Sequence, residues 1–163
     1  MTNPIRPTDD DARALAQNLL RDARFAALGV LTADNQPLVT RVAFGLDPDG
    51  APVSLISDLA AHTRALTENP NCSLLIGEPG GRGDPLTHPR LTLQARARFL
   101  RHGARGHAEM AAHYLRDHPK SKLYVGFADF SFVLFDVSIG HLNGGFGKAF
   151  TLSPADMNLP SRS

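Results

Sequence analysis

Two periods of apolar residues follow one another along this chain, the first typical of helices and the second of strands. After Thr8 and the acidic run Asp9-Asp10-Asp11, apolar residues recur at helical spacing. This pattern predicts a helix over about residues 9–22, capped by Thr8, with one face packed on the rest of the protein. The apolar positions of that face are Ala12, Leu15, Ala16, Leu19 and Leu20.

From Phe25 the pattern changes to short apolar runs separated by turn residues, which predicts an antiparallel sheet. The turns between the first three runs are short, so we expect these three strands to form a meander. The run 90–100 alternates apolar and polar residues, and its polar face, with Arg96 and Arg98, is solvated or contacts a partner. The predicted strands cover residues 25–31, 37–46, 52–57, 71–77, 90–100 and 131–137.

Two further segments complete the expected architecture. Residues 78–89 contain three glycines and three prolines and predict a loop, whereas residues 106–117 predict a helix that ends before Pro119. Strands with a few peripheral helices predict an α+β barrel. We interpret the 163 residues as one domain, with the barrel at about 25–152 and a loosely ordered polar tail at 153–163.

Composition narrows the classes of partner. The 17 basic and 16 acidic residues give a formal net charge of +1, so no global field attracts nucleic acid or an anionic membrane. The single cysteine, Cys72, lies in a strand-like run and is expected to be a buried core residue in a reducing cytoplasm. No apolar run approaches the length of a membrane span, about 20 residues. We therefore expect a soluble, cytoplasmic protein.

Residues 57–70 concentrate groups that suit an anion. This segment reads S-D-L-A-A-H-T-R-A-L-T-E-N-P and places Ser57, His62, Thr63 and Arg64 around the start of a short helix. Unpaired N–H groups and the helix dipole favour a phosphate there. The hydroxyls of Ser57 and Thr63 suit phosphate binding and helix capping equally, so both roles remain open.

The same segment resembles the flavin-binding split barrels related to pyridoxamine 5′-phosphate oxidase. A second segment, H-L-N-G-G-F-G-K-A-F at residues 141–150, resembles the Gly-Gly-Phe-Gly segment of the haem-utilisation (HugZ-type) branch of that superfamily. The resemblance covers about residues 25–152 and implies an antiparallel split β-barrel. It further implies a homodimer that binds FMN at the subunit interface and acts on a small-molecule substrate as a flavin-dependent oxidoreductase or flavin reductase.

The resemblance also assigns site residues. In the related oxidases two basic residues hold the flavin phosphate, and Thr40 and His62 stand at those two positions, with Arg41 and Arg64 nearby as substitutes. The glycines of the second segment suit close approach to a planar cofactor, although a tight turn anchored by Phe146 is the other interpretation. The expected cofactor-binding residues are Thr40, Arg41, Val42, Ser57, His62, Thr63, Arg64, Gly144, Gly145, Phe146, Gly147 and Lys148.

Other chemistries find less support in the sequence. The spacing of His107, His113 and His118 suits solvated helix positions and no metal site, and no nucleophile elbow or dinucleotide fingerprint occurs. No side chain stands out as a catalytic acid or base. Pyridoxamine 5′-phosphate oxidase itself is disfavoured because a chain without tryptophan lacks a counterpart of that enzyme's substrate-binding C-terminal segment.

Three alternatives to FMN chemistry stay open. The first is HugZ-type haem binding and degradation, for which His141 is the nearest candidate ligand, because no histidine follows it. The second is a cofactor-free barrel that acts as a binding module, since both phosphate-binding basic positions are replaced. The third is a deazaflavin-dependent reductase on the same fold.

Overall fold

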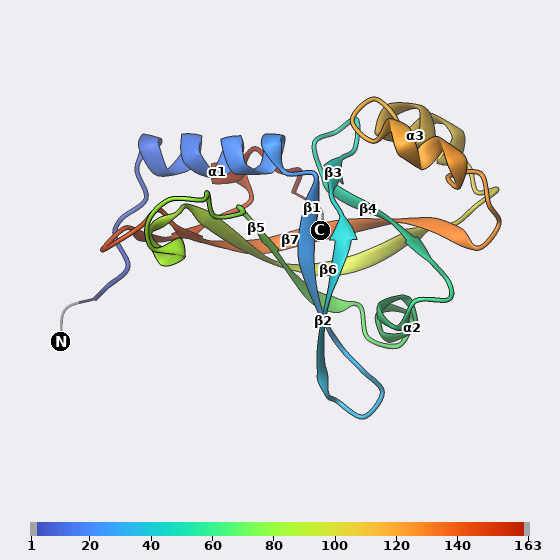
Figure 1. Cartoon of the computed structure of the whole chain (residues 1–163), viewed down its shortest axis with the longest axis horizontal. Helices are drawn as coiled ribbons and strands as arrows, with labels where there is room; N and C mark the ends of the chain where they lie inside the picture. The colour runs from blue at the N-terminus through green and yellow to red at the C-terminus, as the bar shows by residue number, and fades with distance from the viewer. Residues whose placement is uncertain (1–2, 162–163) are drawn as a thin grey trace.

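A strongly curled antiparallel sheet forms the body of the protein in the computed structural model, which describes residues 3–161 (Figure 1). The strand order is β2-β1-β5-β6-β7-β4-β3, and β8 pairs with β7. The strands are β1 (Phe25–Leu31), β2 (Pro37–Ala43), β3 (Gly45–Leu46), β4 (Pro52–Ser57), β5 (Asn71–Ile76), β6 (Arg90–Leu100), β7 (Phe130–Asn143) and β8 (Ala149–Leu152). The α-helices are α1 (Asp10–Asp22), α2 (Ala61–Glu68) and α3 (His107–Tyr114), and short 3₁₀ turns occupy Pro85–Thr87, Pro119–Leu123 and Ala155–Met157. The predicted α+β split barrel with peripheral helices is confirmed.

The N-terminal helix forms where the apolar period predicts it, but its cap differs. Asp9, one residue after Thr8, is the N-cap, and its carboxylate accepts a hydrogen bond from Ala12 N at 2.8 Å. The Thr8 hydroxyl instead donates to the carbonyl of Thr151 in β8 at 3.1 Å. Both residue types cap helices well, and the contact with β8 decides between them.

The expected meander of the first three strands is confirmed in part. Strand β1 pairs with β2, and β3, at the end of the predicted run 37–46, pairs with the start of β4. On its other edge β4 pairs with β7 over most of its length, with Val53 opposite Leu134. Five of the six residues of β4 are buried, so this strand needs cover on both faces. Turn residues fix where the chain reverses, but the burial of β4 decides which strand it joins.

The main core lies inside the curl of the sheet, where the apolar face of α1 packs against it. The C-terminal segment belongs to this core as well: Met157 and Leu159 are buried, and Arg13 binds Asp156 at 2.8 Å. The prediction of a loosely ordered tail is therefore wrong for residues 153–161, and residues 162–163 lie outside the described part. Two apolar side chains in a polar segment were sufficient to dock it.

A second core forms on the outer face of β4 and β7, beneath α3 and the residues that follow it. His107 is buried against Phe132, with the two ring centroids 5.2 Å apart. His118 stacks on Tyr114 at 4.2 Å, and His113 bonds the carbonyl of Leu46 at 3.0 Å. The expectation that these three histidines are solvated is wrong: His107 is buried, and His113 on α3 and His118 after it are partly buried. Within residues 3–161 no helix is long and apolar enough to cross a membrane.

Candidate functional site

The two residues at the expected phosphate-binding positions meet in the structure. Thr40 lies on β2 and His62 in the first turn of α2, and Thr40 Oγ1 lies 2.9 Å from His62 Nδ1 in a hydrogen bond. Both side chains are partly buried, and burial lowers the pKa of His62. At neutral pH the pair is therefore uncharged, which is the opposite of what a phosphate dianion favours.

The hydroxyls beside this pair are used for local structure. Thr63 Oγ1 donates to the carbonyl of Ser57 at 2.6 Å, and Ser57 Oγ accepts from Leu59 N at 3.2 Å. Thr63 is 3% exposed, so its hydroxyl is enclosed. Both hydroxyls stabilise the turn before α2, and neither caps the helix, whose N-cap is Ala60 without a side-chain capping bond.

The expected substitute cations point elsewhere. The Arg41 guanidinium lies over the ring of Phe25, 5.5 Å from its centroid, on the face of β2 opposite Thr40. Val42 turns into the main core. Arg64 is exposed and lies two positions after His62, which on an α-helix is a rotation of about 200°. Neither Arg41 nor Arg64 therefore adds a positive charge to the Thr40–His62 pair.

The glycine segment forms a tight turn between β7 and β8. Gly144 N donates to the Lys148 carbonyl at 2.8 Å, and Gly145 N donates to Asn143 Oδ1 at 3.0 Å. Phe146 at the tip is 84% exposed, so it is not the core anchor considered from the sequence. Gly147 and Lys148 are also exposed, and Gly147 has φ +66. In Figure 1 this turn lies at the left end of the molecule and α2 lies in the right half, so one chain does not bring the two groups of predicted residues together.

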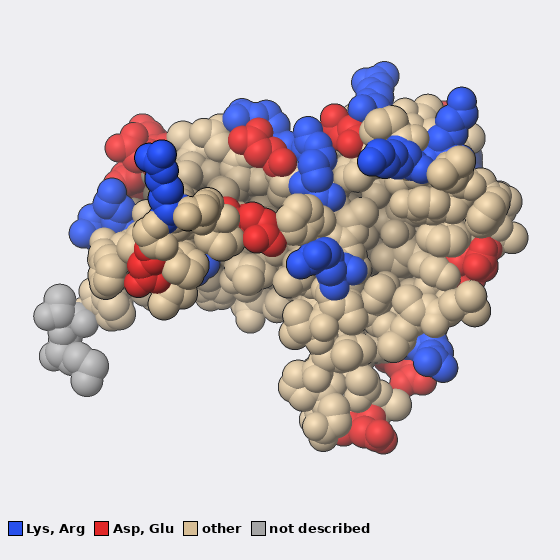
Figure 2. Space-filling model, in the orientation of Figure 1, with Lys and Arg blue, Asp and Glu red and all other residues tan. Residues whose placement is uncertain are grey.

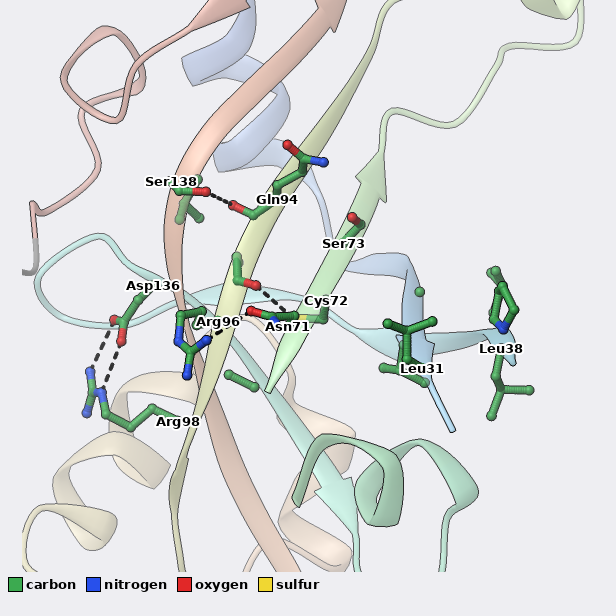
Figure 3. A pocket seen from close by; sticks show the side chains of 17 residues that line it. Leu31, Leu38, Asn71, Cys72, Ser73, Gln94, Arg96, Arg98, Asp136 and Ser138 are labelled. Atoms are coloured by element: carbon green, nitrogen blue, oxygen red, sulfur yellow. Dashed lines mark hydrogen bonds and ion pairs between the residues drawn. The ribbon is translucent and has the colours of Figure 1, made fainter. Parts of the chain in front are cut away.

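A groove that the sequence did not single out as a cofactor site lies on the outer face of the sheet. It has a volume of about 950 Å³ and runs across β1, β2, β5, β6 and β7 (Figure 3). We call this surface the open face. On the same side of the sheet, α3 covers the neighbouring part up to Leu134 and leaves the groove uncovered. Its lining residues include Gln94, Arg96, Arg98, Asp136 and Ser138.

The polar floor of the groove is organised by hydrogen bonds across the strands. Arg96 donates to Asn71 Oδ1 at 3.0 Å, and Arg98 approaches the two carboxylate oxygens of Asp136 at 3.4 and 3.5 Å. Ser138 donates to the Gln94 carbonyl beside a register shift between β6 and β7. The alternation of β6 predicted the polar face correctly, but only the pairing with β7 adds the carboxylate.

His141 lies beside this groove, next to its lining residue Gln94. Strand β7 is longer than predicted and reaches Asn143, so His141 is a strand residue opposite Thr92 and shares a face with Gln94. Its Nε2 lies 3.3 Å from Gln94 Oε1, and the ring is exposed. His141 is paired with Thr92, and Arg96 lies four residues further along β6. At about 3.3 Å per residue, this separates Arg96 from the position of His141 by about 13 Å along the strand.

The charged side chains of both signs are mixed on the surface. Figure 2 shows basic and acidic side chains interspersed over the side of the molecule that it displays. Among residues 3–161 no group of three or more histidine, cysteine, aspartate or glutamate side chains is arranged to hold a metal ion. Charge recognition by this protein therefore depends on local sets of side chains such as those in the groove.

Comparison with known proteins places the chain in a family. Residues 12–142 match the family described as Pyridoxamine 5'-phosphate oxidase. The chain belongs to this family. Proteins of the family bind flavin or haem. The resemblance seen in the sequence is thus confirmed, including its haem-related branch.

Three known proteins illustrate the similarity. The chain is 36% identical over 118 residues to the non-canonical heme oxygenase HOZ of Arabidopsis thaliana, which covers 72% of this chain and 35% of that protein. It is 29% identical, with a TM-score of 0.80, to a heme binding protein from Mycobacterium smegmatis, covering 94% of this chain and 61% of the other. Campylobacter jejuni ChuZ shares the fold at 18% identity, with a TM-score of 0.82 and coverage of 93% and 63%. The chain spans about a third of the length of HOZ.

Proposed function

We propose that this family member binds haem in the groove of the open face. The observation that supports this most directly is the groove of about 950 Å³, which is lined by Arg96, Arg98 and Gln94. His141 lies next to the groove, bonded to Gln94 on the same strand pair. An imidazole is the commonest axial ligand of haem iron, and guanidinium groups pair well with carboxylates such as the haem propionates. The names of HOZ and of the Mycobacterium smegmatis protein support the same ligand.

The residues present suit a flat, dianionic ligand. The floor of the groove is a pleated sheet, with Gly29 and Ser73 as small residues beside the arginines. Arg98 is held towards Asp136 by long contacts of 3.4 and 3.5 Å, which a propionate can replace with shorter ones. Bound haem would supply iron-centred redox chemistry. The chain itself would supply the ligand at His141, a hydrogen-bond acceptor for that ring in Gln94 Oε1, and the countercharge.

We further propose that the working unit is a homodimer. The groove is open on one side, and the open face exposes the apolar side chains Phe25, Val39 and Leu75, of which Val39 lines the groove. Proteins of this family are commonly dimeric. A second copy packed on this face would cover the apolar side chains and complete the cofactor site, as an isologous two-fold interface does.

Haem titration of the purified protein tests this function. The wild type is expected to give a Soret band of bound haem with saturable binding, and His141→Ala is expected to lose that spectrum. His102→Ala is the matched control, because His102 is exposed and lies beyond the C-terminal end of β6, away from the groove. Absence of saturable haem binding by the wild type, or an unchanged spectrum in His141→Ala, would contradict the proposal.

FMN is the second candidate ligand, as the resemblance implies. Its support is the family, whose members bind flavin or haem. A bound flavin would give a flavin-dependent oxidoreductase acting on a small molecule. Quenching of flavin fluorescence in a parallel FMN titration separates this candidate from haem, because the two ligands give different spectra.

A further inference from the structure

We propose that Thr40 and His62 are specificity-determining residues, which form a neutral clasp between β2 and α2 and exclude a flavin phosphate. The two side chains bond each other at 2.9 Å, and the sequence resemblance implies that they stand where the related oxidases carry phosphate-binding basic residues. A phosphate bound here would have to break that bond without finding a cation in exchange. The family fold is kept, but this part of it no longer suits FMN.

The neighbouring polar groups do not compensate. The Thr63 hydroxyl is enclosed and committed to the Ser57 carbonyl at 2.6 Å, and Ser57 Oγ accepts from Leu59 N. Arg41 lies over Phe25 on the opposite face of β2. An incoming phosphate would therefore meet side chains that already have partners.

The clasp has a structural role of its own. In the described part of the chain, β2 has β1 as its ladder partner, and β2 stands at one end of the strand order. The Thr40–His62 bond joins this edge strand to α2, which packs on β1. A partly buried hydrogen bond at this place holds the helix against the sheet where no backbone ladder does.

Riboflavin and FMN differ only in the phosphate, so titrating both ligands tests the proposal on the wild-type protein. We expect FMN to bind no more tightly than riboflavin. In the double variant Thr40→Arg/His62→Arg, FMN affinity is expected to rise by about 100-fold or more while riboflavin affinity stays the same, since two charge-assisted contacts to phosphate become available. The matched control is Arg41→Ala, which is expected to match the wild type for both ligands.

A wild-type protein that binds FMN about 100-fold more tightly than riboflavin would overturn the proposal, because such a difference requires phosphate recognition. This comparison needs no variant, so it decides the question even where the double variant fails to fold. Thermal unfolding of Thr40→Val, His62→Phe and their combination measures the clasp separately. Coupling between the two changes is expected, and strict additivity would contradict the clasp. Haem binding, which uses the other group of residues, is expected to survive in both single variants.

Discussion

The sulfur of Met157 packs against Gly140, so closely that a Cβ on Gly140 would lie 2.6 Å from the sulfur and 2.9 Å from the methyl carbon. This contact joins the C-terminal segment to β7 one residue before His141. Met157 is 2% exposed and belongs to the main core. The position of β7 beside the groove and the docking of residues 153–161 are therefore coupled through one glycine.

Replacement of Gly140 by valine is expected to destabilise the protein by about 1–3 kcal/mol, the range for overpacking a filled core. Met157 would be displaced, so protease cleavage after residue 152 is expected to accelerate. Gly126→Val is the matched control, because a Cβ at Gly126 meets nothing within 4 Å. Equal unfolding temperatures of the two variants would show that Met157 adapts without cost.

The turn between β7 and β8 should be equally sensitive at Gly145. This residue has φ +117, and a Cβ there would lie 3.0 Å from the carbonyl oxygen of Thr87. Gly145→Val is expected to cost about 1–3 kcal/mol of stability, since the backbone conformation is strained for a β-branched residue and the obstacle is backbone. Gly81→Val, in an open part of the 78–89 loop, is the control. Chemical denaturation of both variants measures the difference.

Stability should fall in mild acid because of His107. Burial, with a smaller effect of nearby His102, lowers the pKa of His107, so the folded protein keeps the ring neutral while the unfolded chain takes up a proton below about pH 6.5. The contribution of His107 to the free energy of unfolding is thus present at higher pH and lost as the pH falls. Urea unfolding between about pH 7.5 and about pH 5 is expected to show a smaller loss for His107→Gln than for the wild type. Burial also lowers the pKa of His62, but that residue is common to both proteins.

The proposed dimer makes a further prediction. Val39 is 68% exposed on the open face, and Val39→Asp is expected to shift the protein towards monomer in sedimentation velocity, because it places a charge in an apolar interface. Leu59→Asp is the matched control, since Leu59 is 82% exposed but lies in the turn before α2. A stable interface of this type buries above about 2,000 Å² in total. A wild-type protein that is a folded monomer at micromolar concentration would exclude the dimer and the shared site.

Local sequence determined the elements whose cause is local. The boundaries of β1, β4 and β6 follow from alternation and turn residues, and α1 follows from its apolar period and acidic first turn. Cys72 was expected in the core and is buried there, where burial raises the pKa of its thiol to about 12. The two family motifs identified the fold because they are contiguous stretches.

Tertiary structure decided everything that depends on partners far apart in sequence. Pairing with β6 extended β7 to Asn143 and placed His141 beside Gln94, which lies 47 residues earlier in the chain. The resemblance placed Thr40 and His62 at one site, but the direct bond between them depends on how α2 packs against the sheet. Hydrophobic periodicity indicates which face of a helix or strand is buried. Which side chain it meets on a neighbouring strand or helix depends on strand register and on the packing of the whole chain.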